Sequence, residues 1–106
     1  MEQVHIGTDL VSVDHMYGHT FRWSIDFADG TEHSGDDLRC GAMGADECEM
    51  LGTLLARLGA AGESYGYTVR TGRVSDNSDL FSPSIMEWAY VNSDELSMAQ
   101  YALEEV

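Results

Sequence analysis

The chain has 106 residues, a length typical of one domain, and we expect residues 1–106 to form a single acidic unit. Nineteen aspartates and glutamates stand against five arginines and no lysine, which gives a formal net charge of −14 at pH 7. A surface this negative repels nucleic acid and anionic membranes and attracts basic surfaces. The charge therefore disfavours direct binding to DNA, RNA or lipid headgroups.

The first part of the chain predicts strands joined by turns. Residues 4–13 have the apolar content of a strand, with a change of parity near Asp9 that indicates a bulge or a twist. Residues 14–18 are predicted to form a turn. The clearest strand comes next, because its apolar residues alternate with polar ones: Phe21, Trp23, Ile25 and Phe27.

A hairpin is predicted after this strand. The dipeptide Asp29-Gly30 is favoured in tight hairpin turns, whose central residues take positive φ. Residues 31–33 are predicted to return as a third strand. From Gly35 to Gly44, aspartates and glycines predict a loop.

The first of two predicted amphipathic helices spans residues 46–58. Asp46 suits the N-cap position, and Glu49 follows at the spacing of a capping box. An apolar stripe recurs at three- and four-residue steps: Cys48, Leu51, Leu54, Leu55 and Leu58. Gly59 and Gly62 are predicted to end this helix.

The remaining elements complete the expected fold. Residues 65–74 are rich in tyrosine, threonine and valine and predict a strand, and residues 75–84 predict a polar loop. Residues 85–91 suit either a strand or a short helix, and we favour a strand because residues 92–95 begin a new helix. This last helix is predicted at residues 94–105. The expected fold class is α+β: an antiparallel sheet, in the order β-β-β-α-β-β-α, with two amphipathic helices packed on one face.

The negative charge is concentrated in two stretches. Residues 26–49 and residues 76–106 each carry a net charge of −7, whereas residues 50–75 are net +2. Some of these acids have a local reason, because a carboxylate in the first turn of a helix stabilises it by about 0.3–1 kcal/mol. The others have none, which makes them candidates for recognition of a partner.

These acids favour a non-enzymatic inhibitor that binds the basic nucleic-acid-binding surface of a host protein and mimics the charge of DNA or RNA. Proteins that bind duplex DNA present rows of arginine and lysine to one phosphate charge per ~1.7 Å of axis, and carboxylates can occupy such rows. The chain resembles phage and mobile-element inhibitors of the anti-CRISPR and anti-restriction type in size and charge alone. The predicted partner-binding residues are Asp26, Glu32, Asp36, Asp37, Asp76, Asp79, Glu104 and Glu105.

A second hypothesis is an acidic adaptor or regulatory domain from a GC-rich or salt-adapted organism. The charge would then serve solubility, and the protein would bind its partner through an apolar patch. Trp88, Tyr90 and Tyr101 would anchor such a patch if they are exposed. The net positive charge of residues 50–75 speaks against general salt adaptation, which spreads acids over a whole surface.

A metal or catalytic site is a third hypothesis. His15 and His19 lie four residues apart, with Asp14 adjacent and His33 expected on a neighbouring strand, and these side chains suit zinc. A His-x-x-x-His pair needs a helix to share one face, however, and this pair spans a predicted turn. The sequence also lacks a nucleophile elbow, a phosphate loop and a dinucleotide-binding motif. We therefore expect no cofactor and no enzymatic activity.

The sequence favours a cytoplasmic location, in the host cell if the protein is encoded by a phage. No apolar run approaches the ~20 residues that span a bilayer. The N-terminal residues lack the basic and apolar regions of a signal peptide. Cys40 and Cys48 are expected to be reduced thiols, since intracellular disulfides are rare.

Overall fold

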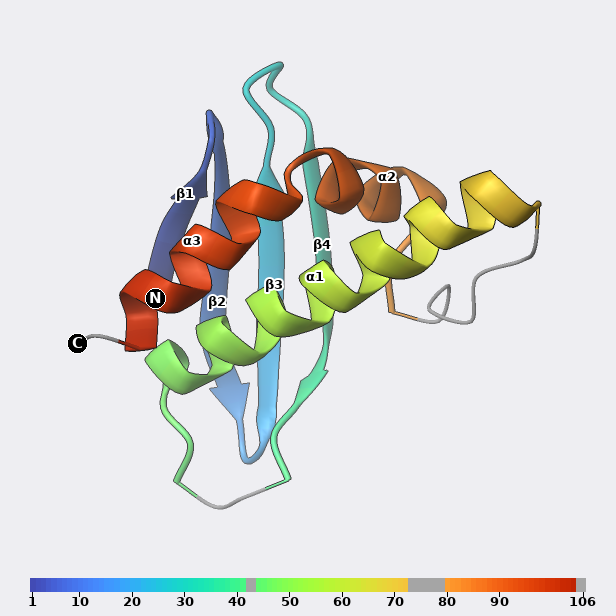
Figure 1. Ribbon diagram of the computed structural model, residues 1–106. Coiled ribbons are helices and arrows are strands. Elements are labelled where there is room, and N and C mark those ends of the chain that lie inside the picture. The colour runs from blue at the N-terminus through green and yellow to red at the C-terminus, as the bar shows by residue number, and fades with distance from the viewer. Residues whose placement is uncertain (42–43, 73–79, 105–106) are drawn as a thin grey trace.

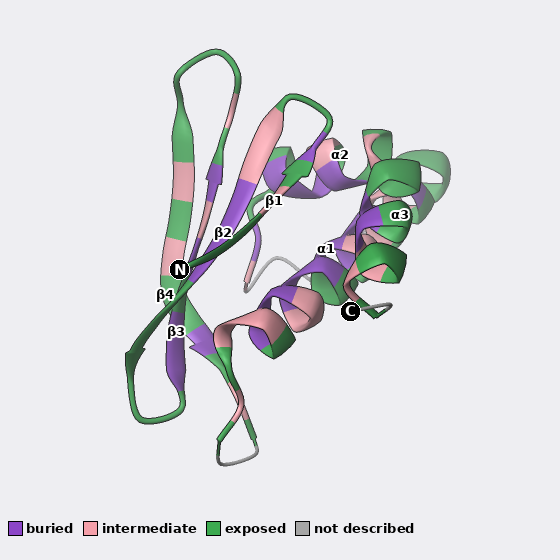
Figure 2. Ribbon diagram, turned by 90° about the vertical axis from the view of Figure 1, so that its left-hand side faces the viewer, coloured by how far each residue is buried: buried purple, intermediate pink, exposed green. Residues whose placement is uncertain are grey.

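The computed structural model describes residues 1–41, 44–72 and 80–104. Four consecutive strands form an antiparallel sheet in which each pairs with its neighbour in sequence: β1 (Glu2–Ile6), β2 (Asp9–Tyr17), β3 (Thr20–Asp26) and β4 (Glu32–Arg39). Three helices follow: α1 (Glu47–Thr71), α2 (Pro83–Val91) and α3 (Ser93–Glu104). All three lie on the same side of the sheet (Figure 1 and Figure 2).

The α+β class is confirmed, and so is an antiparallel sheet with its helices on one face. The predicted order of elements is wrong, because the chain runs β-β-β-β-α-α-α. The predicted strand at residues 4–13 is a hairpin of two strands, β1 and β2. Gly7 has a φ of 62°, in the left-handed region that favours glycine, and reverses the chain between them. The change of parity near Asp9 marks this reversal, and β2 then takes in most of the predicted turn at residues 14–18.

A hairpin turn does lie at Asp29-Gly30, but it is not the predicted tight type, because Gly30 has a φ of 93° whereas Asp29 has no positive φ. Strand β4 is also longer than the predicted third strand. It continues from Glu32 to Arg39 through residues predicted to be a loop. Gly35 lies opposite Trp23 and Leu38 opposite Phe21, so β4 has one extra residue and bulges at Asp36 and Asp37. Because β4 is an edge strand, its aspartates are exposed to solvent. Charged residues are common at sheet edges.

Helix α1 begins as predicted but does not end at the predicted glycines. The Asp46 carboxylate accepts a hydrogen bond from the Glu49 backbone N–H at 2.8 Å, which confirms the N-cap. The helix then continues to Thr71, so the strand predicted at residues 65–74 is wrong as far as it is described. Gly62 is needed inside the helix because α2 crosses there: an added Cβ would lie 2.8 Å from the carbonyl carbon of Ala89.

The segment that suited either a strand or a helix is helix α2, so the preference for a strand is wrong. Ser82 caps it, with its hydroxyl accepting from the Ile85 N–H at 3.4 Å, and Pro83 occupies the first turn. Serine followed by proline is a helix-start signal. The isoleucine, tryptophan, tyrosine and valine of the segment have strand propensity, but packing against α1 prevails over that propensity.

The core lies between the sheet and the helices (Figure 2). The predicted inward residues of β3, Phe21, Trp23 and Ile25, are buried, as are the four leucines of the α1 stripe: Leu51, Leu54, Leu55 and Leu58. Each large side chain that is fully buried contributes roughly 1.5–3 kcal/mol. Because the described helices all lie on this one side, none of them covers the opposite face of the sheet.

Candidate functional site

The uncovered face of the sheet is polar. Alternation along the strands sends polar side chains to it, because residues such as Val13 and Trp23 take the helical side. One polar row crosses the middle of the sheet through neighbours in register: Gln3, Ser12, Ser24 and Ser34. The serine side chains are short, and the rows on either side of them carry larger charged side chains.

Two shallow hollows lie along this row. One, of about 210 Å³, is lined by Met1, Gln3, Ser12, Asp14, Arg22, Ser24, Asp26 and Glu32. The other, of about 350 Å³, is lined by Met16, Arg22, Ser34, Gly35 and Asp36. Arg22 belongs to both and separates them. We call the surface formed by these lining residues the open face.

Negative charge predominates on the open face. The Arg22 guanidinium lies 3.2 Å from the Glu32 carboxylate, and both side chains are about half exposed, so the pair contributes at most about 1 kcal/mol. Asp14 lies opposite Arg22 in register, and Asp26 lies opposite Glu32. Like charges that face each other across strands are destabilising. Beyond the hollows, Arg39 ends β4.

The structure brings three of the eight predicted partner-binding residues together. Asp26, Glu32 and Asp36 line the open face. Glu104 ends α3, in the helical layer. Asp76, Asp79 and Glu105 lie outside the described residues.

Asp37 has a structural contact that the sequence did not reveal. Its carboxylate accepts a hydrogen bond from the Trp23 indole N–H at 3.0 Å. The Trp23 ring lies against Gly35, where an added Cβ would be 2.6 Å from the indole nitrogen, and meets Phe81 edge-on. The bulge therefore sends Asp37 toward the buried tryptophan, while Asp36 lines the open face.

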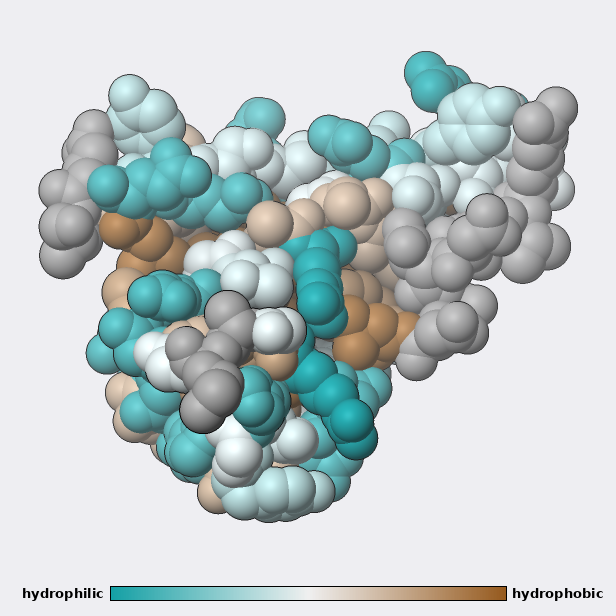
Figure 3. Space-filling model, turned by 90° about the horizontal axis from the view of Figure 1, so that it is seen from below, coloured by the Kyte–Doolittle hydropathy of each residue, from teal (hydrophilic) through white to brown (hydrophobic). Residues whose placement is uncertain are grey.

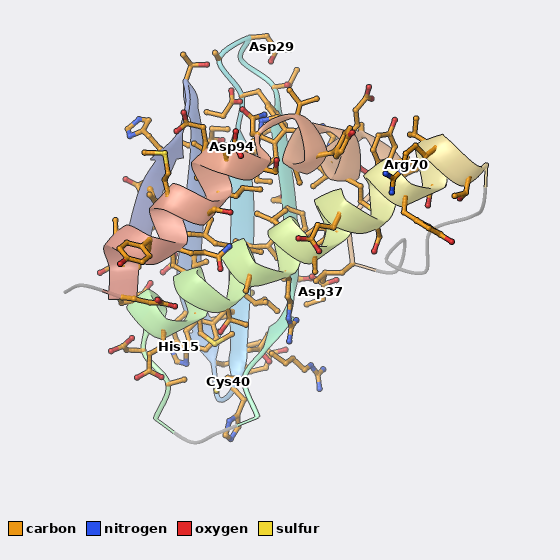
Figure 4. The ribbon with its side chains drawn as sticks, viewed as in Figure 1. His15, Asp29, Asp37, Cys40, Arg70 and Asp94 are labelled. Carbon is orange, nitrogen blue, oxygen red and sulfur yellow. The ribbon has the colours of Figure 1, made fainter. Side chains whose placement is uncertain are left out.

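The described acids of the second stretch lie on the helices. Glu87 is on α2, and Asp94, Glu95 and Glu104 are on α3. In Figure 4, Asp94 lies on α3, and Asp29 lies at the tip of the β3–β4 hairpin. Among the described residues, none of the acids of the second stretch lines the hollows of the open face. The two stretches do meet elsewhere, because Glu49 of the first and Glu104 of the second line one groove between α1 and α3.

Two carboxylates outside the open face have lowered pKa values. The Met1 ammonium donates a hydrogen bond to Glu47 at 3.3 Å, which lowers the Glu47 pKa, and the His15 backbone N–H at 3.2 Å acts in the same direction. Asp29 accepts from the Thr31 hydroxyl at 2.6 Å and from its N–H at 2.9 Å, which lowers the Asp29 pKa. Both contacts favour the charged carboxylate and have structural causes, so they do not indicate acid–base catalysis.

The histidines considered as metal ligands have other neighbours. His15 Nε2 lies 3.0 Å from the Gly18 carbonyl oxygen, and the His15 ring meets Phe21 edge-on. The His33 ring packs edge-on against Phe27. Within residues 1–41, 44–72 and 80–104, no three histidine, cysteine, aspartate or glutamate side chains are placed to hold a metal ion.

Sequence reasoning missed Asp14, Arg22 and the serine row. The alternation that predicted Trp23 in the core also placed Arg22 and Ser24 on the opposite face, so this part of the signal was present in the sequence. Asp14 fell in a predicted turn. The serine row depends on the register of four strands, which the sequence does not specify by itself.

Comparisons with models of protein families, with curated proteins and with solved structures find no match for this chain. In the part of the chain that the structure describes, no helix is long and apolar enough to cross a membrane. The open face is therefore the basis for assigning a function.

Proposed function

We propose that this protein is a non-enzymatic inhibitor that binds, through its open face, a basic nucleic-acid-binding surface of another protein and competes there with DNA or RNA. One observation carries the proposal. None of the described helices lies over the open face, and its hollows are lined by four carboxylates and one arginine. The proposed partner is a nucleic-acid enzyme of the host, such as a CRISPR or restriction enzyme.

The arrangement of carboxylates suits arginine and lysine side chains of a partner. Neighbouring strands lie about 4.8 Å apart, so Asp26 and Glu32, in register on adjacent strands, present two acceptors to one guanidinium or ammonium group. A bound cation also relieves the repulsion between these two carboxylates. The hydroxyls of Ser24 and Ser34 supply further donors and acceptors, whereas Ser12 is only 4% exposed and accepts from Gln3.

Electrostatics also determines the expected kinetics. A net charge of −14 attracts a basic partner over a distance and accelerates the encounter. The rate of association should therefore fall as salt rises. A partner bound in this way competes with nucleic acid, because both ligands use the same arginines and lysines.

The test neutralises two carboxylates of the open face. Asp26 and Asp36 have no ion pair among the described residues, so the double variant Asp26→Asn with Asp36→Asn breaks no described ion pair. A change at Glu32, by contrast, would leave Arg22 without its partner. The matched control is Glu63→Gln with Glu87→Gln, which removes the same charge from exposed positions of α1 and α2. Partners are captured from host lysate at low salt, identified, and then measured as purified proteins.

The expected result is a captured nucleic-acid-binding protein that added DNA or RNA displaces and that elutes at about 0.5 M salt, where screening acts over a few ångströms. Its affinity should fall about tenfold or more with the open-face variant and less than about twofold with the control. Equal losses of affinity in the two variants would mean that net charge alone, and not the open face, determines binding. An unchanged affinity of the open-face variant would refute the proposal.

An adaptor that binds through an apolar surface is the second candidate, and exposed side chains of the helical layer favour it. Tyr67, Tyr90, Met98 and Tyr101 are 46%, 49%, 68% and 67% exposed. Seen from below, the surface also mixes hydrophobic with hydrophilic residues (Figure 3). A partner bound in this way should survive the salt step and bind the open-face variant normally.

A further inference from the structure

The solvent-facing side of α1 carries a ridge of small residues at four-residue spacing: Gly52, Ala56 and Ala60. Glycine inside a helix costs about 1 kcal/mol relative to alanine, so a close contact usually explains it. A Cβ added at Gly52 would have no atom within 4 Å. Packing among the described residues therefore gives no reason for Gly52.

The same helix contains a second ridge, and there a close contact with another helix explains the glycines. Gly62 and Gly66 also lie four residues apart, and α2 crosses them. An added Cβ would lie 2.8 Å from the Ala89 carbonyl carbon at the first position and 2.5 Å from the Tyr90 ring at the second. The ridge at Gly62 and Gly66 is thus a place where another helix packs closely, whereas no described helix packs on the ridge at Gly52.

A groove of about 420 Å³ lies beside the open ridge, between the start of α1 and the end of α3. Gly52 and Ala56 contribute to its lining from α1, and Leu103 from α3. Glu49 and Glu104 also line it, one from each helix, and none of the lining residues is basic. The groove thus combines small and apolar residues with a negative charge on each side.

We propose that this groove binds an amphipathic helix of a partner protein, with lysine or arginine flanking its apolar face. The apolar residues of that helix lie on the ridge at Gly52 and Ala56, as α2 lies on the ridge at Gly62 and Gly66. A long basic side chain suits both parts of the groove, because its stem covers apolar surface while its charge reaches a carboxylate. A second copy of this chain is disfavoured, since each copy carries a charge of −14. This interface lies in the helical layer and does not depend on the proposed function of the open face.

The test uses the isotope-labelled full chain and a synthetic amphipathic helical peptide of leucine and lysine. Two control peptides are a scrambled one with the same composition and one with glutamate in place of lysine. Gly52→Leu fills the groove, because its side chain grows into open space. Val69→Leu is the control: it also places a leucine at an exposed position of α1, and Val69 does not line the groove.

We expect the leucine–lysine peptide to shift the amide resonances of Gly52 and of residues 103–104, and both control peptides to bind at least about tenfold more weakly. Gly52→Leu should weaken binding by about tenfold, whereas Val69→Leu and the open-face variant should bind like the wild type. Gly52→Ala should stabilise the free protein and yet weaken binding, a combination that loss of folding cannot produce. Failure of the peptide to bind, shifts confined to the open face, or unchanged affinity of Gly52→Leu would each overturn the proposal.

Discussion

Asp9 connects three parts of the fold through one carboxylate. One of its oxygens accepts from the Trp88 indole N–H of α2 at 2.7 Å, and the other accepts from the Ala28 backbone N–H after β3 at 2.9 Å. The Trp88 ring is partly buried and meets Phe27 edge-on, with ring centroids 5.8 Å apart. Hydrogen bonds to a charged acceptor are roughly twice as strong as neutral ones. This single residue therefore fixes α2 to the turns of the sheet.

Replacing Asp9 with alanine removes both acceptors and leaves a partly buried indole N–H without its partner. We expect the free energy of unfolding to fall by about 2–3 kcal/mol. Urea denaturation followed by tryptophan fluorescence measures this change. Glu87→Gln, at an exposed position of α2, is the control and should change stability by less than about 0.5 kcal/mol. A similarly small effect of Asp9→Ala would mean that this carboxylate does not hold α2.

At the scale of elements, the crossing of α1 and α2 depends on what surrounds each glycine. The neighbour of Gly62 is the backbone of α2, which has no rotamer to change. The neighbour of Gly66 is the ring of Tyr90, a half-exposed side chain that can rotate away. The two glycines have the same spacing and face the same helix, but they should differ in their tolerance of a larger side chain.

Gly62→Ala should lower the free energy of unfolding by about 1–3 kcal/mol, because the added methyl group pushes α2 away from α1. Gly66→Ala should cost clearly less. Thermal denaturation followed by circular dichroism compares the two variants with the wild type. Helix propensity acting alone would make Gly62→Ala more stable by about 1 kcal/mol, and that outcome would show that α2 does not approach α1 so closely.

The sequence predicted the elements whose signal is local. Alternation placed Trp23 in the core, and capping located the start of α1 at Asp46, because both signals depend on residues a few positions apart. The glycines of α1 wrongly predicted the end of the helix. Gly62 and Gly66 are there because α2 packs closely against them, and α2 lies far along the chain and comes close only in the fold. The helix α2 itself was signalled by Ser82 and Pro83, but the strand propensity of the following residues obscured this signal.

The candidate site was predictable to a smaller extent. Alternation along β3 places Asp26 with Arg22 on the polar side, so this part of the open face follows from sequence. The separation of Asp36 from Asp37 does not, because it depends on a bulge whose position is set by pairing with β3. Whether two acidic stretches share a surface is a question of topology, and composition carries no information about it.

At the scale of the whole molecule, repulsion between carboxylates opposes folding. The chain has a net charge of −14, and the ion pairs found among the described residues are Met1–Glu47 and Arg22–Glu32. Net charge far from zero destabilises a compact state through self-repulsion. Salt weakens this repulsion, since the screening length falls from about 30 Å at 0.01 M to about 3 Å at 1 M.

We therefore expect the melting temperature to rise with sodium chloride between these concentrations, as measured by calorimetry. The control variant Glu63→Gln with Glu87→Gln should melt higher than the wild type at low salt, and its melting temperature should respond less to salt. A protein stabilised mainly by ion pairs would behave in the opposite way. A melting temperature that falls with salt would thus contradict the importance of self-repulsion.

All four strands precede all three helices in the chain, and this order matters during synthesis. A ribosome releases the N-terminal part first, at about 5–20 residues per second, so the sheet residues emerge before α1 does. Until Leu51 to Leu58 appear, the inner side chains of β2 and β3 have nothing to cover them. The nascent chain is therefore expected to stay unfolded, and open to chaperones, until most of it has been made.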